Sequence, residues 1–245
     1  MTSTRLKTGA ALAVAAVAAW AGPSLVWWDP LRLRLAPGLA GIGDPGHLAL
    51  TFDDGPDPES TPAFLRELDR LGWKATFFML GSMVAAAPAL AAEVASAGHE
   101  VAVHGYHHRG SLRRSPSWIR DDLRRAISTI EEVSATRVTW YRPPFGELSS
   151  GALLAAKSCG VRPVLWTAWG RDWRPDATPQ SVIADLRRGR LNGGTALLHD
   201  SDCTSADGSW KTALASLPLL ADTASALGLN VGPLRDHGLT GLPRS

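Results

Sequence analysis

Two adjacent carboxylates, Asp53 and Asp54, are the residues of this chain best placed to do chemistry. They follow the apolar run 48–52 and precede the turn pair Gly55-Pro56. Neighbouring side chains point to opposite faces within a strand, but both can reach one pocket where the strand breaks into a turn. One carboxylate can then bind a hard cation while the other stays free as a base, which predicts metal-assisted hydrolysis. Two solvated turn acids are the alternative, and they explain an isolated Asp-Asp pair better.

Two histidines, His104 and His108, supply candidate metal ligands. They follow the apolar run 101–103 at a spacing of four residues, which places both imidazoles on one side of a helical turn. With one carboxylate oxygen they form a set that leaves positions open for water and substrate, as a catalytic metal site requires. We expect His107, between them, to point away or to make only an outer contact.

Arg142 and His199 each follow another short apolar run. Arg142 is fixed by two prolines in the run 141–146, and its planar guanidinium suits pairing with a carboxylate. His199 leaves the end of the run 194–198, a natural position for a general acid. Taken singly, a solvated arginine in a surface turn and a histidine at the edge of the core explain these two residues equally well.

Strand and helix patterns alternate along the chain between these clusters. Strands are expected at 46–52, 74–79, 99–104, 137–141, 161–166, 194–199 and 229–232, and helices at 60–72, 82–97, 115–134, 149–158, 179–190 and 211–227. The helices carry apolar residues at three-to-four spacing, and the strands are short apolar runs bounded by Gly or Pro. This alternation predicts an α/β fold, a closed or nearly closed barrel of about seven parallel strands. Each polar cluster falls at the C-terminal end of its strand, where such barrels carry their active sites.

In this order the motifs resemble those of the NodB-homology domain of the polysaccharide deacetylases, carbohydrate esterase family four. The motifs are Thr-Phe-Asp-Asp-Gly-Pro at 51–56, His-x-x-x-His at 104–108, Arg-Pro-Pro-Phe at 142–145 and Leu-Leu-His at 197–199. The resemblance covers residues 45–235 and implies a distorted (β/α) barrel. It further implies hydrolysis of N-acetyl groups from aminosugars of a cell-wall or extracellular polysaccharide, either peptidoglycan or a chitin-like polymer. The implied cofactor is a divalent metal, zinc first, with cobalt, nickel and manganese as other candidates.

The resemblance also implies a role for each site residue. Asp53 would be the general base, and Asp54, His104 and His108 would be the metal ligands. Arg142 would orient the base. The backbone N–H of Phe145 would bind the oxyanion, and His199 would be the general acid.

The chain departs from the family pattern at two positions. Gly105 stands where the family has Ser or Thr, and we expect the missing hydroxyl to loosen the metal-site loop. The family motif Asp-x-x-Asp-Trp is matched by residues 169–173, with Trp169 in place of the first Asp, which in the family tunes the acid histidine. We place the surviving Asp172 among the catalytic candidates, as a partner of His199 or of Arg142; a purely structural role is the alternative. A weakened partner for the acid histidine would lower activity or shift its pH dependence.

Aromatic residues suggest how a sugar would be held. The chain has ten Trp against five Phe and two Tyr, and flat aromatic faces suit stacking on a sugar ring. Trp169, Trp173 and Tyr106 are therefore candidate substrate-binding residues, with a role in the core as the alternative. Trp166 lies inside an expected strand and is assigned to the core.

Composition indicates one globular domain. The 245 residues are 45% hydrophobic and 20% charged, enough for one barrel-sized core. The net charge of +2 neither indicates a nucleic-acid-binding protein nor excludes an anionic cell-wall substrate. We expect a monomer that binds an acetylated polysaccharide and no nucleic acid.

Residues 1–28 are expected to be a signal peptide or a membrane anchor. Two basic residues precede an uncharged stretch from 8 to 28, long enough to span a membrane, and Ala19-Trp20-Ala21 fits a cleavage site. Either route delivers the domain outside the cytoplasm, secreted or anchored to the outer face of the membrane. Residues 29–44 are expected to be a linker or a strand laid on the barrel, 45–235 the deacetylase-like domain and 236–245 a tail.

Cys159 and Cys203 are expected to be free, mostly buried thiols. They lie at opposite ends of strands that separate them by ~17–20 Å, whereas a disulfide requires Cα atoms within ~7 Å.

Two rival functions stay open. One is a metal hydrolase of the same fold that acts on a small amide or cyclic imide. The other is a catalytically silent polysaccharide-binding module, which the complete set of ligands, base and acid disfavours. Export and the tryptophan-rich site favour a polymer over a small metabolite.

Overall fold

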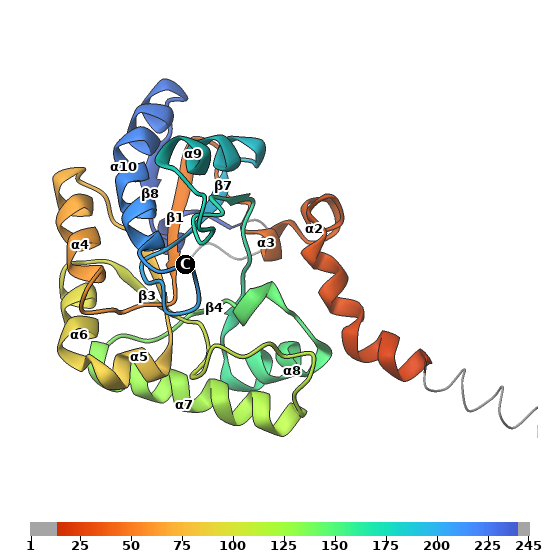
Figure 1. Cartoon of the computed structure of the whole chain (residues 1–245). Coiled ribbons are helices and arrows are strands. Elements are labelled where there is room, and N and C mark those ends of the chain that lie inside the picture. The colour runs from red at the N-terminus through yellow and green to blue at the C-terminus, as the bar shows by residue number, and fades with distance from the viewer. Residues whose placement is uncertain (1–13, 240–245) are drawn as a thin grey trace, which may run out of the picture.

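The strands of this computed structural model, which describes residues 14–239, form one parallel sheet curled into an incomplete barrel (Figure 1). The strands run in the order β5-β4-β3-β2-β1-β7-β6, and β8 pairs with the start of β1. The predicted α/β fold with about seven parallel strands is therefore confirmed. The strand bounds are β1 His47–Asp53, β2 Thr76–Met79, β3 Glu100–Val103, β4 Trp140–Tyr141, β5 Arg162–Pro163, β6 Ala168–Trp169, β7 Gly194–His199 and β8 Asn230–Gly232.

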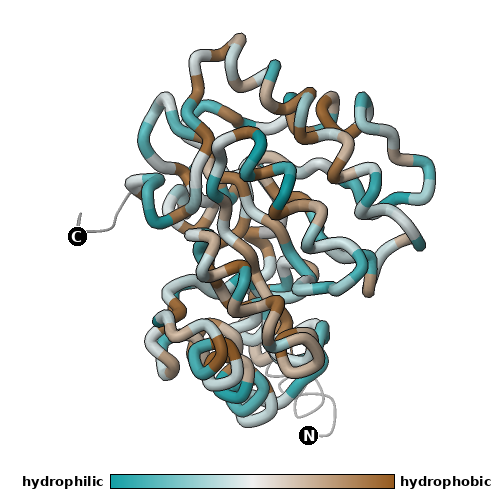
Figure 2. The backbone as a smooth tube through the Cα atoms, turned by 90° about the vertical axis from the view of Figure 1, so that its left-hand side faces the viewer, coloured by the Kyte–Doolittle hydropathy of each residue, from teal (hydrophilic) through white to brown (hydrophobic). Residues whose placement is uncertain are grey.

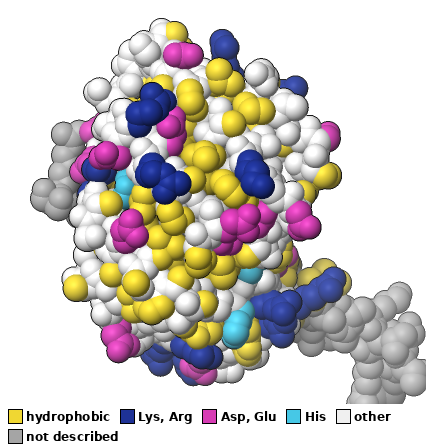
Figure 3. All heavy atoms as spheres, turned by 60° about the vertical axis from the view of Figure 1, so that its left-hand side comes forward, with side chains coloured by type: hydrophobic (Ala, Val, Ile, Leu, Met, Phe, Trp, Pro, Cys, Tyr) yellow, Lys and Arg dark blue, Asp and Glu magenta, His cyan; other side chains and the backbone are white. Residues whose placement is uncertain are grey.

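Helices cover the outside of this sheet. Their bounds are α4 Thr61–Arg70, α5 Gly81–Ala86, α6 Pro88–Ser96, α7 Pro116–Ser134, α8 Ser150–Cys159, α9 Pro179–Arg188 and α10 Ser209–Ala226. The expected helix 82–97 is interrupted at Ala87, which adopts φ −135° because the residue before a proline is disfavoured in helical conformation. Hydrophobic stretches gather in the centre of the molecule, between the helices and the sheet (Figure 2). Acidic and basic side chains are interspersed on the face shown in Figure 3.

The sheet does not close between β5 and β6. The expected strand 161–166 is reduced to β5, and the chain leaves the pairing with β4 after Val164, whose N–H still donates to the carbonyl of Tyr141. Leu165 N–H donates to the carbonyl of Leu39 at 2.7 Å, and Thr167 N–H donates to the carbonyl of Thr195 at 2.9 Å. The prediction of one continuous strand here is wrong, because Leu165 bonds to a segment far away in the sequence.

That segment is the N-terminal part of the chain. Residues 14–21 are helical and are followed by η1 Gly22–Trp27, α2 Asp29–Leu35 and α3 Pro37–Ala40, which approach the barrel from the right in Figure 1. The alternation of Leu and Arg at 31–35 does not form a strand. Arg32 instead pairs with Asp29 three residues earlier, a spacing that brings side chains together on a helix.

The signal or anchor prediction falls partly on residues 1–13, which lie outside the described residues. Among residues 14–239, no helix is both long and apolar enough to cross a membrane. The indole N–H of Trp20 donates to the carbonyl of Leu112 at 2.9 Å, so the described end of this segment contacts the folded domain.

Both cysteines are free, as predicted. The prediction that they are mostly buried is wrong: Cys203 is exposed and Cys159 is half-buried. Cys203 lies in the loop after β7, on the surface of the molecule.

Candidate active site

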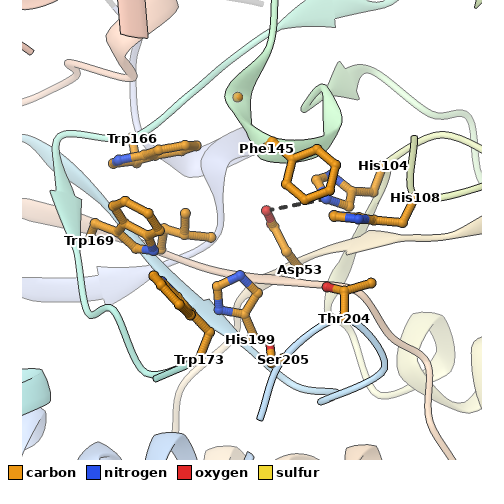
Figure 4. A pocket seen from close by; sticks show the side chains of 12 residues that line it. Asp53, His104, His108, Phe145, Trp166, Trp169, Trp173, His199, Thr204 and Ser205 are labelled. Carbon is orange, nitrogen blue, oxygen red and sulfur yellow. Dashed lines mark ion pairs between the residues drawn. The ribbon is translucent and has the colours of Figure 1, made fainter. Parts of the chain in front are cut away.

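The C-terminal ends of the strands bring the polar clusters together around one cavity of about 370 Å³ (Figure 4). Asp53 ends β1 and His199 ends the neighbouring β7, where the two are register partners. In Figure 4 His104, His108 and Phe145 lie on one side of the cavity and the tryptophans on the other, with His199 beside Trp173. The lining residues are Asp53, His104, His108, Phe145, Gly146, Trp166, Trp169, Trp173, Leu197, His199, Thr204 and Ser205.

The carboxylates of Asp53 and Asp54 both lie near His104 Nε2, at 3.8 and 3.5 Å, because the backbone turns sharply at Asp54. Asp54 adopts φ +83°, a left-handed conformation that non-glycine residues rarely take and that often marks functional sites. This turn reverses the alternation of the strand and brings the two adjacent carboxylates together. The roles of base and metal ligand for this pair stay predictions.

The residues predicted as metal ligands form one compact group. Asp54 Oδ1 lies 3.5 Å from His104 Nε2 and 3.4 Å from His108 Nε2, and the three atoms lie within 4.8 Å of one another. Burial lowers the pKa of His104 to about 3 and also lowers the pKa of His108, so both imidazoles are neutral. His104 Nδ1 lies 2.8 Å from the carbonyl of Arg142 and so carries the ring proton, which leaves the Nε2 lone pair facing the group.

A divalent cation fits this group. Asp54 Oδ1 is buried and has no hydrogen-bond partner, and such an atom is costly unless a cation or donor satisfies it. Two neutral imidazole nitrogens and one carboxylate oxygen are a donor set that zinc and several other divalent metals accept.

Arg142 fixes the position of Asp53. Its Nη1 donates to Asp53 Oδ1 at 2.6 Å and to Thr51 Oγ1 at 2.8 Å, and its Nη2 donates to the carbonyl of Leu165 at 2.8 Å. The guanidinium is fully buried over the ring of Phe78. Burial raises the pKa of Asp53 and the ion pair with Arg142 opposes it, so Asp53 is a stronger base than a surface aspartate.

Asp172 contacts His199, one of the two partners that the sequence left open for it. His199 Nδ1 lies 2.9 Å from Asp172 Oδ1, and the backbone N–H of His199 donates to Asp172 Oδ2 at 2.7 Å. Burial alone would lower the pKa of His199, but the neighbouring carboxylates, Asp172 foremost, raise it to about 10. His199 is therefore protonated at neutral pH.

His199 keeps a carboxylate partner although Trp169 replaces the first Asp of the family motif. After β6 the chain turns at Arg171, which adopts φ +50°, and the next residue, Asp172, reaches His199. The carboxylate that this chain lacks at the first position of the motif is thus supplied by Asp172 at the fourth position.

The expectation of a looser metal-site loop at Gly105 is not supported. Asp122 on α7 accepts hydrogen bonds from the backbone N–H groups of Tyr106 at 2.8 Å and His107 at 3.2 Å. Gly105 itself adopts φ +93°, where L side chains are rare. A carboxylate from a helix therefore steadies the loop that the family steadies with a hydroxyl.

Tyr106 does not line the cavity, which corrects its assignment as a substrate-binding residue. Its ring is buried beneath the guanidinium of Arg125, 3.7 Å away, and its hydroxyl accepts a hydrogen bond from the same arginine. Tyr106 therefore belongs to the hydrophobic core.

The other aromatic candidates do line the cavity. Trp169 and Trp173 stack with ring centroids 6.2 Å apart and planes inclined by 29°, and Trp173 is 39% exposed. Trp166 is buried, as expected, but also forms part of the cavity wall. Phe145 is exposed at the rim against His108, and the oxyanion role of its N–H stays a prediction.

Thr204 is a site residue that sequence reasoning missed. Its hydroxyl donates to Asp54 Oδ2 at 2.7 Å, which leaves the other carboxylate oxygen facing the histidines. Thr204 lies in a polar loop without a recognisable motif. The one feature that could have indicated a role for Thr204 is its position, because the loop follows His199 at the C-terminal end of β7.

Comparison with known proteins agrees with this site. The family model "Polysaccharide deacetylase" matches residues 40–164, about half of the sequence. The chain therefore belongs to the polysaccharide deacetylase family. The match ends before Asp172 and His199, which the structure adds to the site.

Two of the curated relatives are deacetylases of aminosugar-containing substrates. A chitooligosaccharide deacetylase from Bradyrhizobium sp. is 33% identical over 76% of this chain and 87% of that protein. A peptidoglycan-N-acetylglucosamine deacetylase from Bacillus cereus is 34% identical over 62% of this chain and 72% of that protein.

Solved structures share the fold. A family 4 carbohydrate esterase from Streptomyces lividans in complex with acetate is 28% identical, with a TM-score of 0.68 over 76% of this chain and 92% of that one. A CE4 family pseudoenzyme from Bacillus anthracis is 24% identical, with a TM-score of 0.71 over 79% of this chain and 66% of that one. The second likeness concerns the fold alone.

Proposed function

We propose that this chain is a metal-dependent hydrolase that removes N-acetyl groups from aminosugars of a cell-wall or extracellular polysaccharide, peptidoglycan or a chitin-like polymer. One observation carries the proposal: a buried carboxylate base and a protonated histidine face one cavity from adjacent strand ends, beside a complete group of metal donors. The activities of the named relatives support the same reaction.

Asp54, His104 and His108 would hold the metal, zinc first and cobalt, nickel or manganese as other candidates. Bound there, a divalent ion would polarise the amide carbonyl and lower the pKa of the attacking water.

Asp53 would take the proton of the attacking water. Its Oδ1 is held by Arg142, while Oδ2 lies 3.8 Å from His104 Nε2, beside the metal donors. A base needs a pKa that approaches the working pH, and burial moves the pKa of Asp53 in that direction. The N–H of Phe145 would donate to the oxyanion, an interaction worth ~3–4 kcal/mol per donor in other hydrolases.

His199 would protonate the departing amine. An amine anion is a very poor leaving group, so a proton must be delivered as the C–N bond breaks. Asp172 holds Nδ1 and thereby aims Nε2 at the cavity. The stacked rings of Trp169 and Trp173 would support the sugar on the side opposite the metal donors.

Two other functions would use the same cavity differently. A small amide or cyclic imide would fit a cavity of about 370 Å³, and a silent binding module would keep the groove without turnover. The intact base, acid and ligand set argue against the silent module, although pseudoenzymes with this fold exist. The wall of stacked tryptophans favours a sugar polymer.

The protein would act outside the cytoplasm, as a monomer, secreted or attached to the membrane through residues 1–28. No nucleic-acid partner is proposed. The polysaccharide substrate is the partner that the site chemistry calls for.

The test measures acetate release by the full chain, with added zinc or cobalt, from N-acetylated chitooligosaccharide and from peptidoglycan. Release from either polymer supports the proposal, and the faster one names the substrate class. Metal binding without release from either polymer would support the small-amide reading. Failure to bind any metal would contradict the catalytic assignment.

A further inference from the structure

The open edge between β5 and β6 is filled by the N-terminal segment, defined here as residues 22–44. Val26 and Leu39 pack against a buried cluster of Leu165, Trp166 and Leu197. The Leu39 carbonyl accepts the N–H of Leu165 at 2.7 Å, in place of a neighbouring strand. The segment therefore completes the wall of the barrel beside the active site.

Arg142 depends on this wall for one of its anchors. It is fully buried, and one end of its guanidinium binds Asp53 while Nη2 donates to the carbonyl of Leu165. Val164 and Thr167 bond to Tyr141 on β4 and to Thr195 on β7, but residues 165 and 166 between them have no strand partner, because β5 and β6 do not pair. The orientation of the base therefore depends on whatever fixes residues 165 and 166.

Arg32 on α2 holds the carbonyl of Trp166, the residue after Leu165. Its Nη2 donates to the carbonyl of Trp166 at 2.9 Å and its Nη1 to the carbonyl of Val26 at 2.8 Å, and it pairs with Asp29. The side chain is fully buried, and its guanidinium lies 5.5 Å from the centre of the Trp166 ring. The two arginines thus hold successive carbonyls, at 165 and 166, of the same irregular stretch.

Burial of an arginine is energetically unfavourable because its charge loses hydration. Removing a guanidinium from water costs several kcal/mol, and apolar residues of similar volume often stabilise a core as well or better. Its planar fork, however, can hold two carbonyls in a fixed relation, which an apolar side chain cannot do.

We propose that Arg32 is a positioning residue of the reaction: it holds the Trp166 carbonyl, and through that stretch it sets Arg142 and hence Asp53. The N-terminal segment is then part of the catalytic unit and not a linker to it. This inference rests on the proposed deacetylase function.

The test compares four full-length variants with the wild type: Arg32→Met, Arg32→Lys, Asp29→Asn and, as a matched control, Arg34→Met from the exposed side of the same helix. For each we would measure kcat, KM, the dissociation constant for zinc and the melting temperature. Small displacements of catalytic groups can cost ~100-fold in rate. We expect Arg32→Met to lower kcat about 10- to 100-fold.

The pattern across the variants separates positioning from packing. Arg32→Lys should recover part of the loss, and Asp29→Asn, which leaves the arginine in place, should cost only a few-fold. The zinc constant should stay within about twofold, because no metal ligand touches residues 165 or 166. The assays run well below each melting temperature, so that unfolding does not lower kcat.

A double-mutant cycle with Arg142→Lys tests the route of the effect. If Arg32 acts through Arg142, then Arg32→Met should cost less than about threefold in the Arg142→Lys background. Additive losses would overturn the proposal, as would an Arg32→Met variant with wild-type kcat.

If the Arg32→Met chain does not fold, Arg32→Lys and Asp29→Asn provide the test, and wild-type kcat in both would overturn the proposal. A wild type that releases no acetate would instead contradict the proposed function itself.

Discussion

Asp172 gives His199 its charge, and this sets the pH range of the reaction. The pKa of His199 is raised to about 10, so the imidazolium is present below that pH and is lost above it. In Asp172→Asn the largest of the charges that raise this pKa is gone, Asp53 and Asp54 keep a smaller raising effect, and burial still lowers the pKa. We expect kcat at neutral pH to fall about 10- to 100-fold, which is part of the ~10²–10⁴-fold that general acid–base catalysis contributes, and the alkaline limb of the kcat profile to move to lower pH.

The control for this variant is Asp176→Asn, an exposed carboxylate on the same loop. An alkaline limb that stays in place in Asp172→Asn would show that Asp172 does not govern the charge of His199.

Thr204 orients a metal ligand from outside the ligand set. Its hydroxyl holds Asp54 Oδ2 and so keeps Oδ1 facing the two histidines. Loss of such outer contacts typically weakens metal binding by about 10- to 100-fold. We expect Thr204→Val to raise the zinc dissociation constant by that factor, measured by competition with a chelator. Thr129→Val on the outer face of α7 is the control, and equal constants in the two variants would contradict this role.

The site residues that could be predicted best from the sequence are those that follow a recognisable apolar strand. Asp53, Asp54, His104 and His108 follow apolar strands directly, and parallel strands must deliver their ends to one edge. Thr204 could not be found in this way, because its loop lacks a fixed spacing. The role of Asp172 depended on one positive φ at Arg171, which no sequence pattern encodes.

At the scale of elements, the metal-site loop 104–109 is held by α7 through Asp122. A serine at 105 would restore the family pattern, but the backbone there adopts φ +93° and an added Cβ would lie 3.2 Å from Asp122 Oδ2. We expect Gly105→Ser to lower the free energy of unfolding by about 1–2 kcal/mol, the cost of forcing a side chain into such a conformation.

Gly105→Ala separates the backbone from the hydroxyl. Both variants should lose about the same stability in urea unfolding. A serine variant that is more stable than the alanine variant, or binds zinc more tightly than the wild type, would show that the family hydroxyl is useful here.

The predictions of secondary structure failed where contacts with distant parts of the chain, and not the local sequence pattern, determine the conformation. The apolar run 161–166 has the composition of a strand, yet Leu165 bonds to Leu39 and to Arg142 instead of to a neighbouring strand. The alternation at 31–35 suggested a strand or linker, but burial of Arg32 at the barrel wall favours a helix. Neither contact partner can be read from the local sequence.

At the scale of the whole molecule, the metal would join the C-terminal ends of two strands, β1 and β3, and should stabilise the fold. A ligand at 100 times its dissociation constant adds about 2.7 kcal/mol, and 1 kcal/mol shifts the melting temperature by about 2–4 °C in a chain of this size. We therefore expect zinc to raise the melting temperature by about 5–10 °C and chelation to reverse the rise. Asp54→Asn should show little of this shift, and a full shift in that variant would place the metal elsewhere.

The most direct measurement is acetate released per zinc bound, by the wild type and by Asp53→Asn, during zinc titration of the metal-free protein on N-acetylated chitooligosaccharide. The variant keeps every metal ligand and loses only the base. We expect wild-type activity to rise until one zinc is bound per chain, while Asp53→Asn binds one zinc and releases no acetate. Acetate release that continues in Asp53→Asn, or that does not follow the bound zinc, would contradict the assignment of this site.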